Sequence, residues 1–408
     1  MGKISHLIDG LRIKRKYYSN QRNSSIWVFG EWFGEKCCDN SKYFANYIAE
    51  SHPKINIMWV TKNGTDVTPL HSKVNIVLMD SIQALKAMSE CGVAVISQGF
   101  QDLSSTGLNF VGGAVSVNLW HGIPWKKIGH DGSRKDNLIY NIYKKINDIA
   151  FSTDFYVSPS DKYDSIARSA HGAKSNQIIH AGYARNSDFY SSEKINAGKR
   201  RTLGQLQKLS PRCDFSKSKI VSYMPTFRNE PSHSRSLETL QVNQRLTNYL
   251  EKKNVILIQK AHFINQIRDG RTNVSGSNRI YSLNNIAAQD LLSASDLLIT
   301  DYSGAFFDFL ILDRPIVHYL YDYDYYRAQD RGLYYDKEDV IAGEEADDEE
   351  QLVDAIIRNL EKPDIYEERR RKIRKIYMKY DTPDSCEVLY QAILKELKRR
   401  NFNESTDS

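Results

Sequence analysis

The sequence predicts an α/β protein made of two doubly wound, Rossmann-like domains. Short runs of Val, Ile and Leu recur along the chain and alternate with stretches whose apolar residues have helical spacing. Such runs are typical of strands buried on both faces of a parallel sheet. The runs also fall into two series, separated by a polar and basic stretch at residues 191–219. This alternation and this division favour two parallel sheets covered by helices.

Each series contains enough strands for one sheet. The first series of predicted strands is Ile26–Phe29, Ile55–Val60, Val74–Met79, Val93–Ser97, Val115–Trp120, Phe155–Ser158 and Ile178–Ala181. The second is Ile220–Met224, Val255–Gln259, Arg279–Leu283, Leu297–Thr300 and Pro315–Tyr319. Helical spacing is clear in Ser41–Ala49, Ser160–Ala170, Asn285–Ala294 and, near the end of the chain, Cys386–Arg400.

The length and composition agree with a two-domain globular protein. The chain has 408 residues, of which 41% are hydrophobic and 26% charged. We predict a basic N-terminal segment at 1–24, an N-terminal domain at 25–190 and a linker with a helix at 191–219. A C-terminal domain at 220–385 and a closing helix with a polar tail at 386–408 complete the predicted organisation.

Targeting signals and disulfides are not expected. No apolar run approaches the roughly 20 residues that span a bilayer, and the basic N-terminus lacks the apolar core of a signal peptide. We therefore expect a cytoplasmic location. The five cysteines are too few and too scattered for a disulfide framework, and no C-x-x-C pair suggests zinc.

The net charge of +6 is unevenly distributed. Basic residues cluster at the N-terminus and again in the run Arg369–Lys375. Such clusters form a solvated helix face, or they bind an anionic membrane surface or a polyanionic substrate. Nucleic acid is not an expected partner, because no recognition module is visible.

His121 is the first candidate for a reactive residue. The predicted strand Val115–Trp120 leads directly into His121, Gly122 and Pro124. Open α/β sheets bind ligands at the carboxyl ends of their strands, and histidine is the side chain best suited to accept a proton near neutral pH. Gly122 permits close approach of the backbone. The alternative is a structural histidine that caps a turn.

Two strands of the second series also end in polar or basic residues. Ile220–Met224 is followed by Thr226 and Arg228, and a guanidinium there can bind phosphate in a bidentate manner. Val255–Gln259 is followed by Lys260 and His262, which alternation places on the same face. Each residue alone is compatible with an ordinary surface role, but together they favour a site.

The segment Ser295–Asp308 predicts an anion site. Its strand turns through Asp301, Ser303 and Gly304 into a helix, with Ser303 as the candidate N-cap. The amino end of a helix favours a diphosphate, and Asp308 is placed to bond ribose hydroxyls. A plain strand–turn–helix unit is the alternative. The pair Asp322 and Asp324 forms D-x-D, which we interpret as an exposed acidic loop rather than a metal site.

Familiar nucleotide and hydrolase motifs are missing from the sequence. It contains no G-x-x-x-x-G-K-[ST], no G-x-G-x-x-G after a strand and no G-x-S-x-G. P-loop, dinucleotide-binding and hydrolase functions are therefore disfavoured.

Taken together, the segments resemble the CDP-glycerol glycerophosphotransferase family, which comprises teichoic-acid polymerases and primases and related capsule enzymes. The resemblance covers roughly Trp27 to Asp384. It depends on the order of these motifs: Phe29-Gly-Glu-Trp-Phe-Gly34, Asp39-Asn-Ser-Lys42, Ser97-Gln-Gly99, Asn118-Leu-Trp-His-Gly-Ile-Pro124, Gly182-Tyr-Ala-Arg-Asn186, Tyr223-Met-Pro-Thr-Phe-Arg228, Lys260-Ala-His262 and Thr300-Asp-Tyr-Ser-Gly304.

The resemblance implies a GT-B-like fold with two domains facing a central cleft, the acceptor in the N-terminal domain and a CDP-alditol in the C-terminal one. It implies His121 as general base and His262 and Ser303 at the donor phosphates, with His262 as a second catalytic residue. It also implies Arg185, in the Gly182–Asn186 motif, as a substrate-binding residue. It also implies peripheral attachment to the inner face of the bacterial cell membrane. The family usually has Pro at Ala184, Asp at Ser187 and a second Ser at Gly304, so donor details can differ here.

The predicted reaction transfers glycerol phosphate or ribitol phosphate from CDP-glycerol or CDP-ribitol. The acceptor is a hydroxyl of a polyol-phosphate or glycan, free or lipid-linked, and CMP is released. Arg228, His262 and the Ser303 helix end are expected to neutralise charge on the phosphates without a metal ion or other cofactor. Two alternatives remain, namely a GT-B glycosyltransferase that uses a nucleotide sugar and a non-catalytic assembly subunit.

Overall fold

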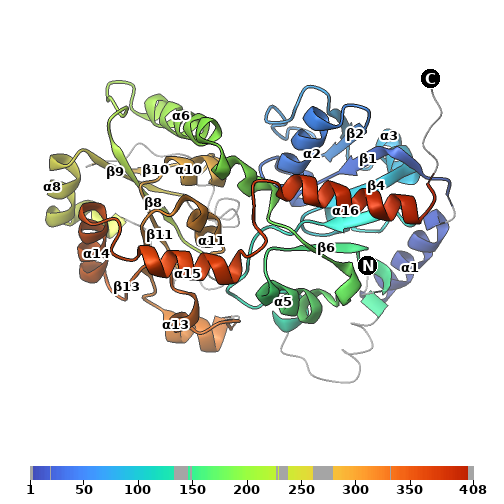
Figure 1. Ribbon diagram of the computed structural model, residues 1–408. Helices are drawn as coiled ribbons and strands as arrows, with labels where there is room; N and C mark the ends of the chain where they lie inside the picture. Colours follow the sequence, from blue (N-terminus) through green and yellow to red (C-terminus); the bar gives the residue numbers. More distant parts are fainter. Residues whose placement is uncertain are drawn as a thin grey trace. The chain divides into compact units, whose positions relative to one another are not determined.

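The computed structural model describes residues 3–18, 20–132, 146–147, 149–226, 228, 238–260, 279–330 and 332–402 (Figure 1). The chain divides into two compact units. Unit 1 consists of Met1–His121, Gly129–Ser187 and Lys379–Ser408, and unit 2 consists of Gly122–Ile128 and Asp188–Met378. His262, one of the predicted site residues, lies outside the described residues.

Unit 1 is built on a sheet of seven parallel strands in the order β3-β2-β1-β4-β5-β6-β7. The strands are β1 (Asn23–Phe29), β2 (Asn56–Thr61), β3 (Asn75–Leu78), β4 (Cys91–Ile96), β5 (Val115–Asn118), β6 (Phe155–Ser158) and β7 (Ile178–His180). The order reverses between β1 and β4, which is the place where ligands bind in doubly wound sheets. All seven predicted strands are therefore present, with ends that differ by up to three residues.

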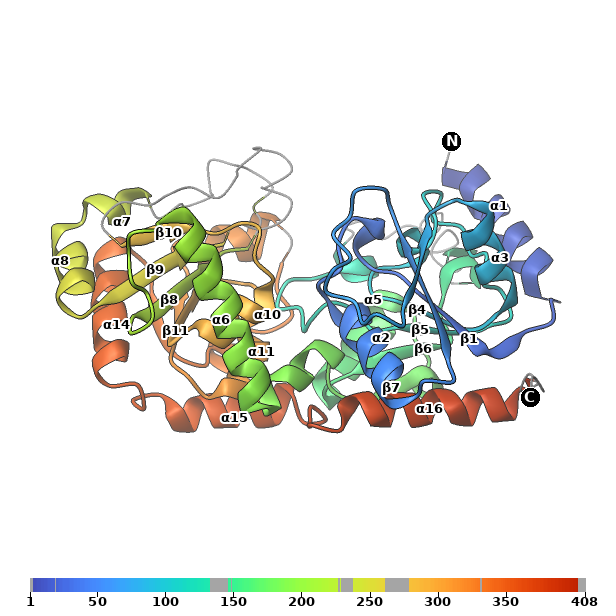
Figure 2. The same ribbon diagram turned by 90° about the horizontal axis from the view of Figure 1, so that it is seen from above.

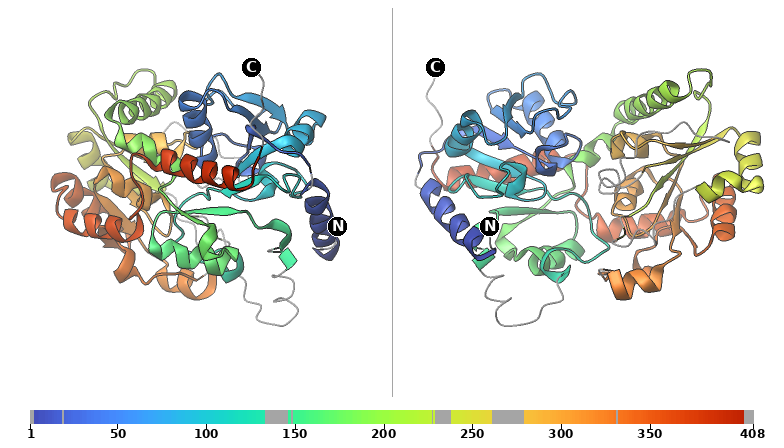
Figure 3. Two further views of the ribbon diagram at one scale, coloured as in Figure 1. Left: turned by 45° about the vertical axis from the view of Figure 1, so that its right-hand side comes forward. Right: turned by 180° about the vertical axis from the view of Figure 1, so that it is seen from behind.

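The helices described for unit 1 include segments from both ends of the chain. They are α1 (Lys3–Tyr18), α2 (Asn40–Ser51), α3 (Ile82–Glu90), α5 (Asp161–His171) and α16 (Ser385–Arg399). Helix α16 runs along unit 1 in Figure 2. Its Tyr390 packs against Trp27 of β1 with ring centroids 5.9 Å apart. Helix α1 lies at one side of unit 1 in Figure 3, and Lys14 of α1 donates a hydrogen bond to the carbonyl oxygen of Ile149.

Unit 2 contains a sheet of six parallel strands in the order β10-β9-β8-β11-β12-β13. The strands are β8 (Lys219–Met224), β9 (Val255–Gln259), β10 (Ile280–Ser282), β11 (Leu297–Thr300), β12 (Ile316–Tyr319) and β13 (Glu344–Ala346). The order again reverses after the first strand, between β8 and β11. The edge strand β13 was not predicted, because its two glutamates hide the apolar pattern; Glu344 is bound by Arg358 and Asn359.

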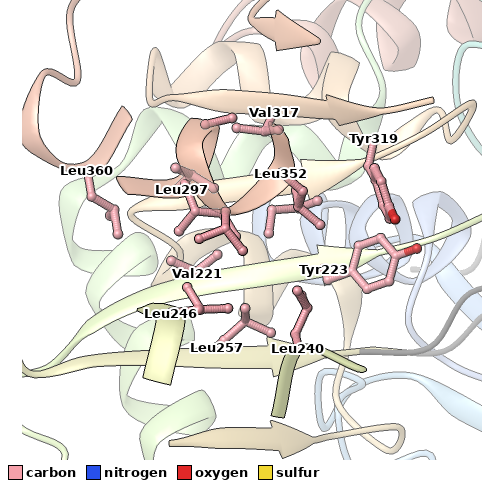
Figure 4. Close-up of a cluster of buried hydrophobic side chains, with 14 of the residues drawn as sticks. Val221, Tyr223, Leu240, Leu246, Leu257, Leu297, Val317, Tyr319, Leu352 and Leu360 are labelled. Atoms are coloured by element: carbon pink, nitrogen blue, oxygen red, sulfur yellow. The ribbon is translucent and has the colours of Figure 1, made fainter. Parts of the chain in front are cut away.

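Helices cover this second sheet. They are α6 (Ser192–Leu209), α7 (Glu238–Val242), α8 (Gln244–Lys252), α10 (Ala288–Ala294), α11 (Ala305–Phe309), α12 (Tyr323–Tyr325), α13 (Lys337–Val340), α14 (Glu349–Glu361) and α15 (Glu367–Tyr377). Their core is one apolar cluster that includes Val221, Leu257 and Leu297 from the strands and Leu246 and Leu352 from the helices (Figure 4).

The predicted linker is an integral part of unit 2. Helix α6 packs against α10, as Figures 1 and 2 show. Arg201 forms an ion pair of 2.6 Å with Asp290, and the Thr202 hydroxyl donates to the carbonyl oxygen of Asp290. Two further segments differ from the predicted organisation, since Gly122–Ile128 belongs to unit 2 and residues 379–385 belong to unit 1 with the closing helix.

Within the described ranges, no helix combines the length and the apolar character required to cross a membrane.

Candidate active site

His121 lies at the carboxyl edge of the unit 1 sheet, as predicted. Strand β5 ends at Asn118, and the backbone then turns sharply, with a φ of +55° at Trp120 and +129° at Gly122. Glycine at the second position lowers the strain of such a turn. The half-buried imidazole has Nδ1 3.4 Å from the carbonyl oxygen of Ser97 and packs against the rings of Trp120 and Trp32, at 4.1 and 5.7 Å.

Arg185 fixes the backbone of His121. Its guanidinium is almost fully buried, pairs with Asp39 at 2.7 Å and donates to the carbonyl oxygen of His121 at 2.9 Å. The side chain of Asn40 joins the same network. It accepts a hydrogen bond from the backbone N–H of Arg185 and donates one to the carbonyl oxygen of Trp120. The structure therefore brings Arg185 and His121 together through contacts that sequence reasoning could not specify.

Two buried acidic residues, Asp39 and Glu31, belong to the hydrogen-bond network next to His121. Asp39 caps α2 and accepts from the indole N–H of Trp32 at 2.9 Å. Glu31 is fully buried after β1 and accepts backbone N–H bonds from Cys38, Asp39 and Lys42.

The protonation of these two acids differs. Burial and then the negative charge of Asp39 raise the pKa of Glu31 to about 8. Burial also opposes ionisation of Asp39, but Arg185 and then His121 hold the pKa of Asp39 below its usual value. Near neutral pH the pair therefore carries one proton, on Glu31, and one negative charge, on Asp39, which balances Arg185.

Asp102 shapes the loop after β4, from which Ser97 approaches His121. Its buried carboxylate accepts backbone N–H bonds from Ser97, Gln98 and Phe33, at 2.9, 2.7 and 2.9 Å. Glu31, Asp39 and Asp102 were not predicted as site residues. Two of them lie in motifs noted in the sequence, but a motif does not reveal that a carboxylate is buried.

The segment after His121 belongs to unit 2. Gly122 begins it, and Trp125 is fully buried there, donating its indole N–H to the carbonyl oxygen of Tyr335 at 2.8 Å. A Cβ atom added at Gly304 would lie 2.5 Å from the carbonyl oxygen of Ile123. Any larger residue at position 304 would therefore require the Ile123 backbone to shift.

The predicted residues at the ends of β8 and β11 meet at the switch point of the unit 2 sheet. The buried carboxylate of Asp301 accepts the N–H of Thr226 at 2.8 Å and pairs with Arg228 at 3.0 Å. The Thr226 hydroxyl is buried without a hydrogen-bond partner among the described residues. Lys260, after β9, donates to the carbonyl oxygen of Asn284 at 3.0 Å.

Arg228 has a different environment from the predicted one. The side chain is 1% exposed, and its guanidinium binds Asp322 through two hydrogen bonds of 2.7 and 3.0 Å in addition to Asp301. Although burial opposes the charge, Asp301 and Asp322 raise the pKa of Arg228. The guanidinium therefore holds two carboxylates where the sequence suggested a phosphate. Asp322 was likewise wrongly interpreted as an exposed acid, since its side chain is 5% exposed.

The turn into α11 also departs from the prediction. Helix α11 has only five residues and its N-cap is Gly304, whereas Ser303 accepts the N–H of Ala305 at 3.3 Å. Asp308 is 2% exposed and accepts from Gln289 at 3.4 Å. A buried carboxylate of this kind is not presented to a ribose, so the predicted role of Asp308 is not supported. Ser303 and Gly304 remain half-buried at the sheet edge.

One group of residues has the composition of a metal site. Asp161, Asp164 and His180 have ligand atoms within 4.8 Å of one another. However, Asp161 already pairs with Lys379 at 2.9 Å and accepts from Tyr380, and His180 binds Asp164 at 2.9 Å. These contacts tie β7 and α5 to the segment before α16, and the group needs no ion to be satisfied.

Two parallel sheets of Rossmann type, each with polar residues at its carboxyl edge, define a fold of the GT-B class. Sequence comparison gives the family. The chain belongs to the CDP-glycerol:poly(glycerophosphate) glycerophosphotransferase family, whose model matches residues 14–395.

Individual relatives agree with this assignment. A teichoic acid glycerol-phosphate transferase of Staphylococcus aureus is 27% identical, covering 93% of this chain and 95% of the relative. A teichoic acid poly(glycerol phosphate) polymerase of Bacillus spizizenii is 28% identical, covering 82% and 84%. A ribitol-phosphate primase from the same species is 26% identical over 59% of each chain. The structure of the wall teichoic acid polymerase TagF has a TM-score of 0.75 at 22% identity, covering 97% of each chain, and supports the fold.

Proposed function

We propose that this protein transfers glycerol phosphate, or ribitol phosphate, from a CDP-alditol to a hydroxyl of a cell-surface polymer or its lipid-linked primer. CMP is the second product, and the polymer is a teichoic acid or a capsule. The observation that carries the proposal is the position of His121, a half-buried imidazole held at a strand end in a chain that matches the family almost throughout.

His121 is the general base in this proposal. If its Nδ1 donates to the carbonyl oxygen of Ser97, the neutral imidazole has its lone pair on Nε2. The acceptor hydroxyl gives its proton to that nitrogen, and its oxygen forms a bond to the phosphorus that carries the alditol. The bond from that phosphorus to the CMP oxygen breaks, and CMP leaves. Arg185, Asp39 and Glu31 act on this step by positioning His121, not by touching the substrate.

Unit 2 binds the donor in this proposal. Thr226, Lys260, Ser303 and Gly304 lie at the carboxyl edge of the sheet, and His262 follows Lys260 in sequence. The unpartnered Thr226 hydroxyl supports this assignment, because a buried hydroxyl favours a hydrogen-bond partner such as a phosphate oxygen. Arg228 and Asp301 hold the Thr226 loop in place, so their effect on the donor is indirect.

No metal ion is required in this proposal. Asp322 of the D-x-D sequence is bound by Arg228 and by the Tyr302 hydroxyl at 3.0 Å, which leaves it poorly suited to a cation. Activity should therefore survive a chelator.

Attachment to an anionic membrane is assigned to helix α1. This helix carries Arg12, Arg15 and Lys16 together with exposed Ile8 and Leu11, at 53% and 37% exposure. Basic and apolar side chains on one short helix suit an anionic lipid surface. The second basic cluster gives less support, because Arg370 is buried against Asp313 and Arg371 pairs with Asp313 and Glu367.

Replacing His121 tests the reaction and its base. The purified full chain is incubated with CDP-glycerol or CDP-ribitol and a short acceptor, and CMP and acceptor-bound alditol phosphate are both measured. We expect His121→Ala to lower turnover about 10²- to 10⁴-fold with little change in donor affinity, while His71→Ala, a histidine of unit 1 outside the site, is normal. Near-normal turnover of His121→Ala would refute the assignment of the base. Release of a nucleoside diphosphate with sugar transfer would instead identify a glycosyltransferase.

A further inference from the structure

A pocket of about 530 Å³ lies in unit 1 beside His121. Its floor includes Ile96, Asn118 and Tyr156, which occupy neighbouring positions on β4, β5 and β6 and therefore point to the same face of the sheet. A volume of this size is typical of a small-molecule site. The contacts described for His121 and for unit 2 do not use this space.

The pocket is separated from His121 by one aromatic ring. Trp120 packs on His121 with ring centroids 4.1 Å apart and on His171, a lining residue, at 4.4 Å. Asn118, also in the lining, accepts the Trp120 N–H at 2.8 Å. Gln98 lines the pocket directly after Ser97, whose carbonyl oxygen contacts His121. A ligand bound here therefore lies next to the proposed base.

The lining favours an uncharged, hydroxyl-rich ligand. Its members are neutral amide and hydroxyl side chains such as Gln98, Asn118 and Thr153, the aromatic rings of Phe151 and Tyr156, and two histidines. Among the described residues that line the pocket there is no Lys, Arg, Asp or Glu. Phosphates are usually bound by Arg or Lys, whereas amides and hydroxyls bond sugar or alditol hydroxyls and aromatic faces cover the C–H groups.

Gln98 provides a second, independent observation. Its side-chain Nε2 is buried and has no hydrogen-bond partner among the described residues. The Ser97 hydroxyl beside it is in the same state. Buried donors without partners are rare in folded proteins because they lower stability. Of the two residues only Gln98 lines the pocket, and turning its side chain towards the pocket would let a ligand oxygen satisfy its Nε2.

The pocket also adjoins the helix assigned to the membrane. Gly10 of α1 packs so closely on Phe151 that an added Cβ would lie 2.7 Å from its ring. Lys14 of α1 binds the carbonyl oxygen of Ile149, two residues before Phe151. An acceptor that is carried on a lipid would reach this part of unit 1 first.

We infer that this pocket binds an uncharged alditol or sugar unit of the acceptor, next to the hydroxyl that His121 deprotonates. The inference rests on the proposed function for the identity of the acceptor. It adds the chemical class that is recognised, namely a neutral polyhydroxylated unit rather than a phosphodiester, and it names Gln98 as a residue that determines acceptor affinity.

Gln98→Met separates a binding role from a structural one. Methionine keeps the length of the side chain but removes the unpartnered donor, so the melting temperature should stay the same or rise. The KM for the acceptor should rise at least tenfold, while the KM for the CDP-alditol stays within twofold. The matched control is Gln244→Met on α8 of unit 2, an exposed glutamine bonded to Asn248, which should change none of these values.

Binding is also measured without turnover, by saturation-transfer NMR of glycerol, ribitol, N-acetylglucosamine and glycerol 3-phosphate with the full chain. We expect either an alditol or N-acetylglucosamine to give a signal, and Gln98→Met to reduce that signal at least fivefold. The compound that binds shows whether the pocket recognises an alditol unit or a sugar unit of the acceptor. Tighter binding of glycerol 3-phosphate than of its neutral counterpart overturns the inference, as does an unchanged acceptor KM in Gln98→Met. If no acceptor yields CMP while neutral ligands still bind through Gln98, the proposed function fails and the pocket stands.

Discussion

Glu31, Asp39 and Arg185 form a buried chain of polar groups behind His121. The charge state of each of these three side chains depends on the other two. Arg185 stabilises the Asp39 carboxylate across 2.7 Å, and burial together with that negative charge raises the pKa of Glu31 and keeps a proton on it. Two buried carboxylates so close together cannot both ionise without a second cation. The network therefore favours one arrangement of the α2 amino end and of the His121 backbone.

The raised pKa of Glu31 predicts a specific dependence of stability on pH. From about pH 5 to about pH 8 the folded protein keeps a proton on Glu31 that the unfolded chain releases. The contribution of Glu31 to the free energy of unfolding should therefore fall as pH rises through this range and level off above its folded pKa. Urea denaturation of the wild type and of Glu31→Gln at a series of pH values measures this contribution as a difference.

Glu35→Gln is the control for that series, because Glu35 is exposed and its ion pair with Lys62, at 2.7 Å, lies at the surface where such pairs contribute little. We expect its difference from the wild type to show no trend over the same range. A difference for Glu31→Gln that is constant, or that increases with pH, would show that Glu31 is ionised in the folded protein.

The binding partner of Arg228 could not be predicted from the residues around it in the sequence. A basic residue after a buried strand has the same pattern whether it binds a phosphate or a carboxylate of its own chain. The deciding partner, Asp322, lies 94 residues further along the chain. Its carboxylate neutralises the guanidinium inside unit 2 and removes both from the surface, which no local pattern could indicate.

Among the elements, α6 shows how two glycines in one helix differ. Gly198 faces α10, where an added Cβ would lie 2.8 Å from the side chain of Ser293, whereas Gly204 faces solvent with no atom within 4 Å. We expect Gly198→Ala to lower the free energy of unfolding by about 1–3 kcal/mol, as overpacking does. Gly204→Ala should raise it by about 0.5–1 kcal/mol through helix propensity.

Chemical denaturation of both variants tests this pair, and each serves as the control for the other because the substitution and the helix are the same. Equal effects would mean that α6 does not pack against α10 through Gly198. In that case the stretch at 191–219 would be the free linker that its polar composition suggested.

The elements that could be predicted are those with a strong apolar signal. Twelve of the strands have runs of Val, Ile or Leu and were placed within three residues, since burial on both faces imposes this composition. Strand β13 was missed because glutamates occupy it. The sheet edges that carry His121, Thr226 and Ser303 were also predicted, because strand ends follow from the strands. Burial of Glu31, Asp102 and Asp308 was not, since it depends on packing between distant segments.

At the scale of the whole molecule, the chain passes between the two units more often than a linear arrangement of domains requires. It enters unit 2 after His121, returns at Gly129, enters again at Asp188 and returns at Lys379. The first of these crossings matters most for the site. His121, the proposed base, is followed directly by Gly122–Ile128, which folds as part of the proposed donor-binding unit. A change in unit 2 can therefore reach His121 through the backbone.

Trp125 should be the anchor of that segment, and its replacement should weaken unit 2 although unit 1 supplies the flanking residues. Trp125→Ala removes a fully buried ring that packs on Tyr302 at 5.4 Å and on Phe306 at 6.2 Å, with an expected loss of about 3–5 kcal/mol. Hydrogen exchange followed by mass spectrometry should show faster exchange in β8, β11 and β12. Trp59→Ala, the same change at a buried position of β2, should instead affect β1 to β3. Faster exchange in unit 1 alone after Trp125→Ala would contradict the assignment of Gly122–Ile128 to unit 2, and with it the backbone route from the proposed donor-binding unit to His121.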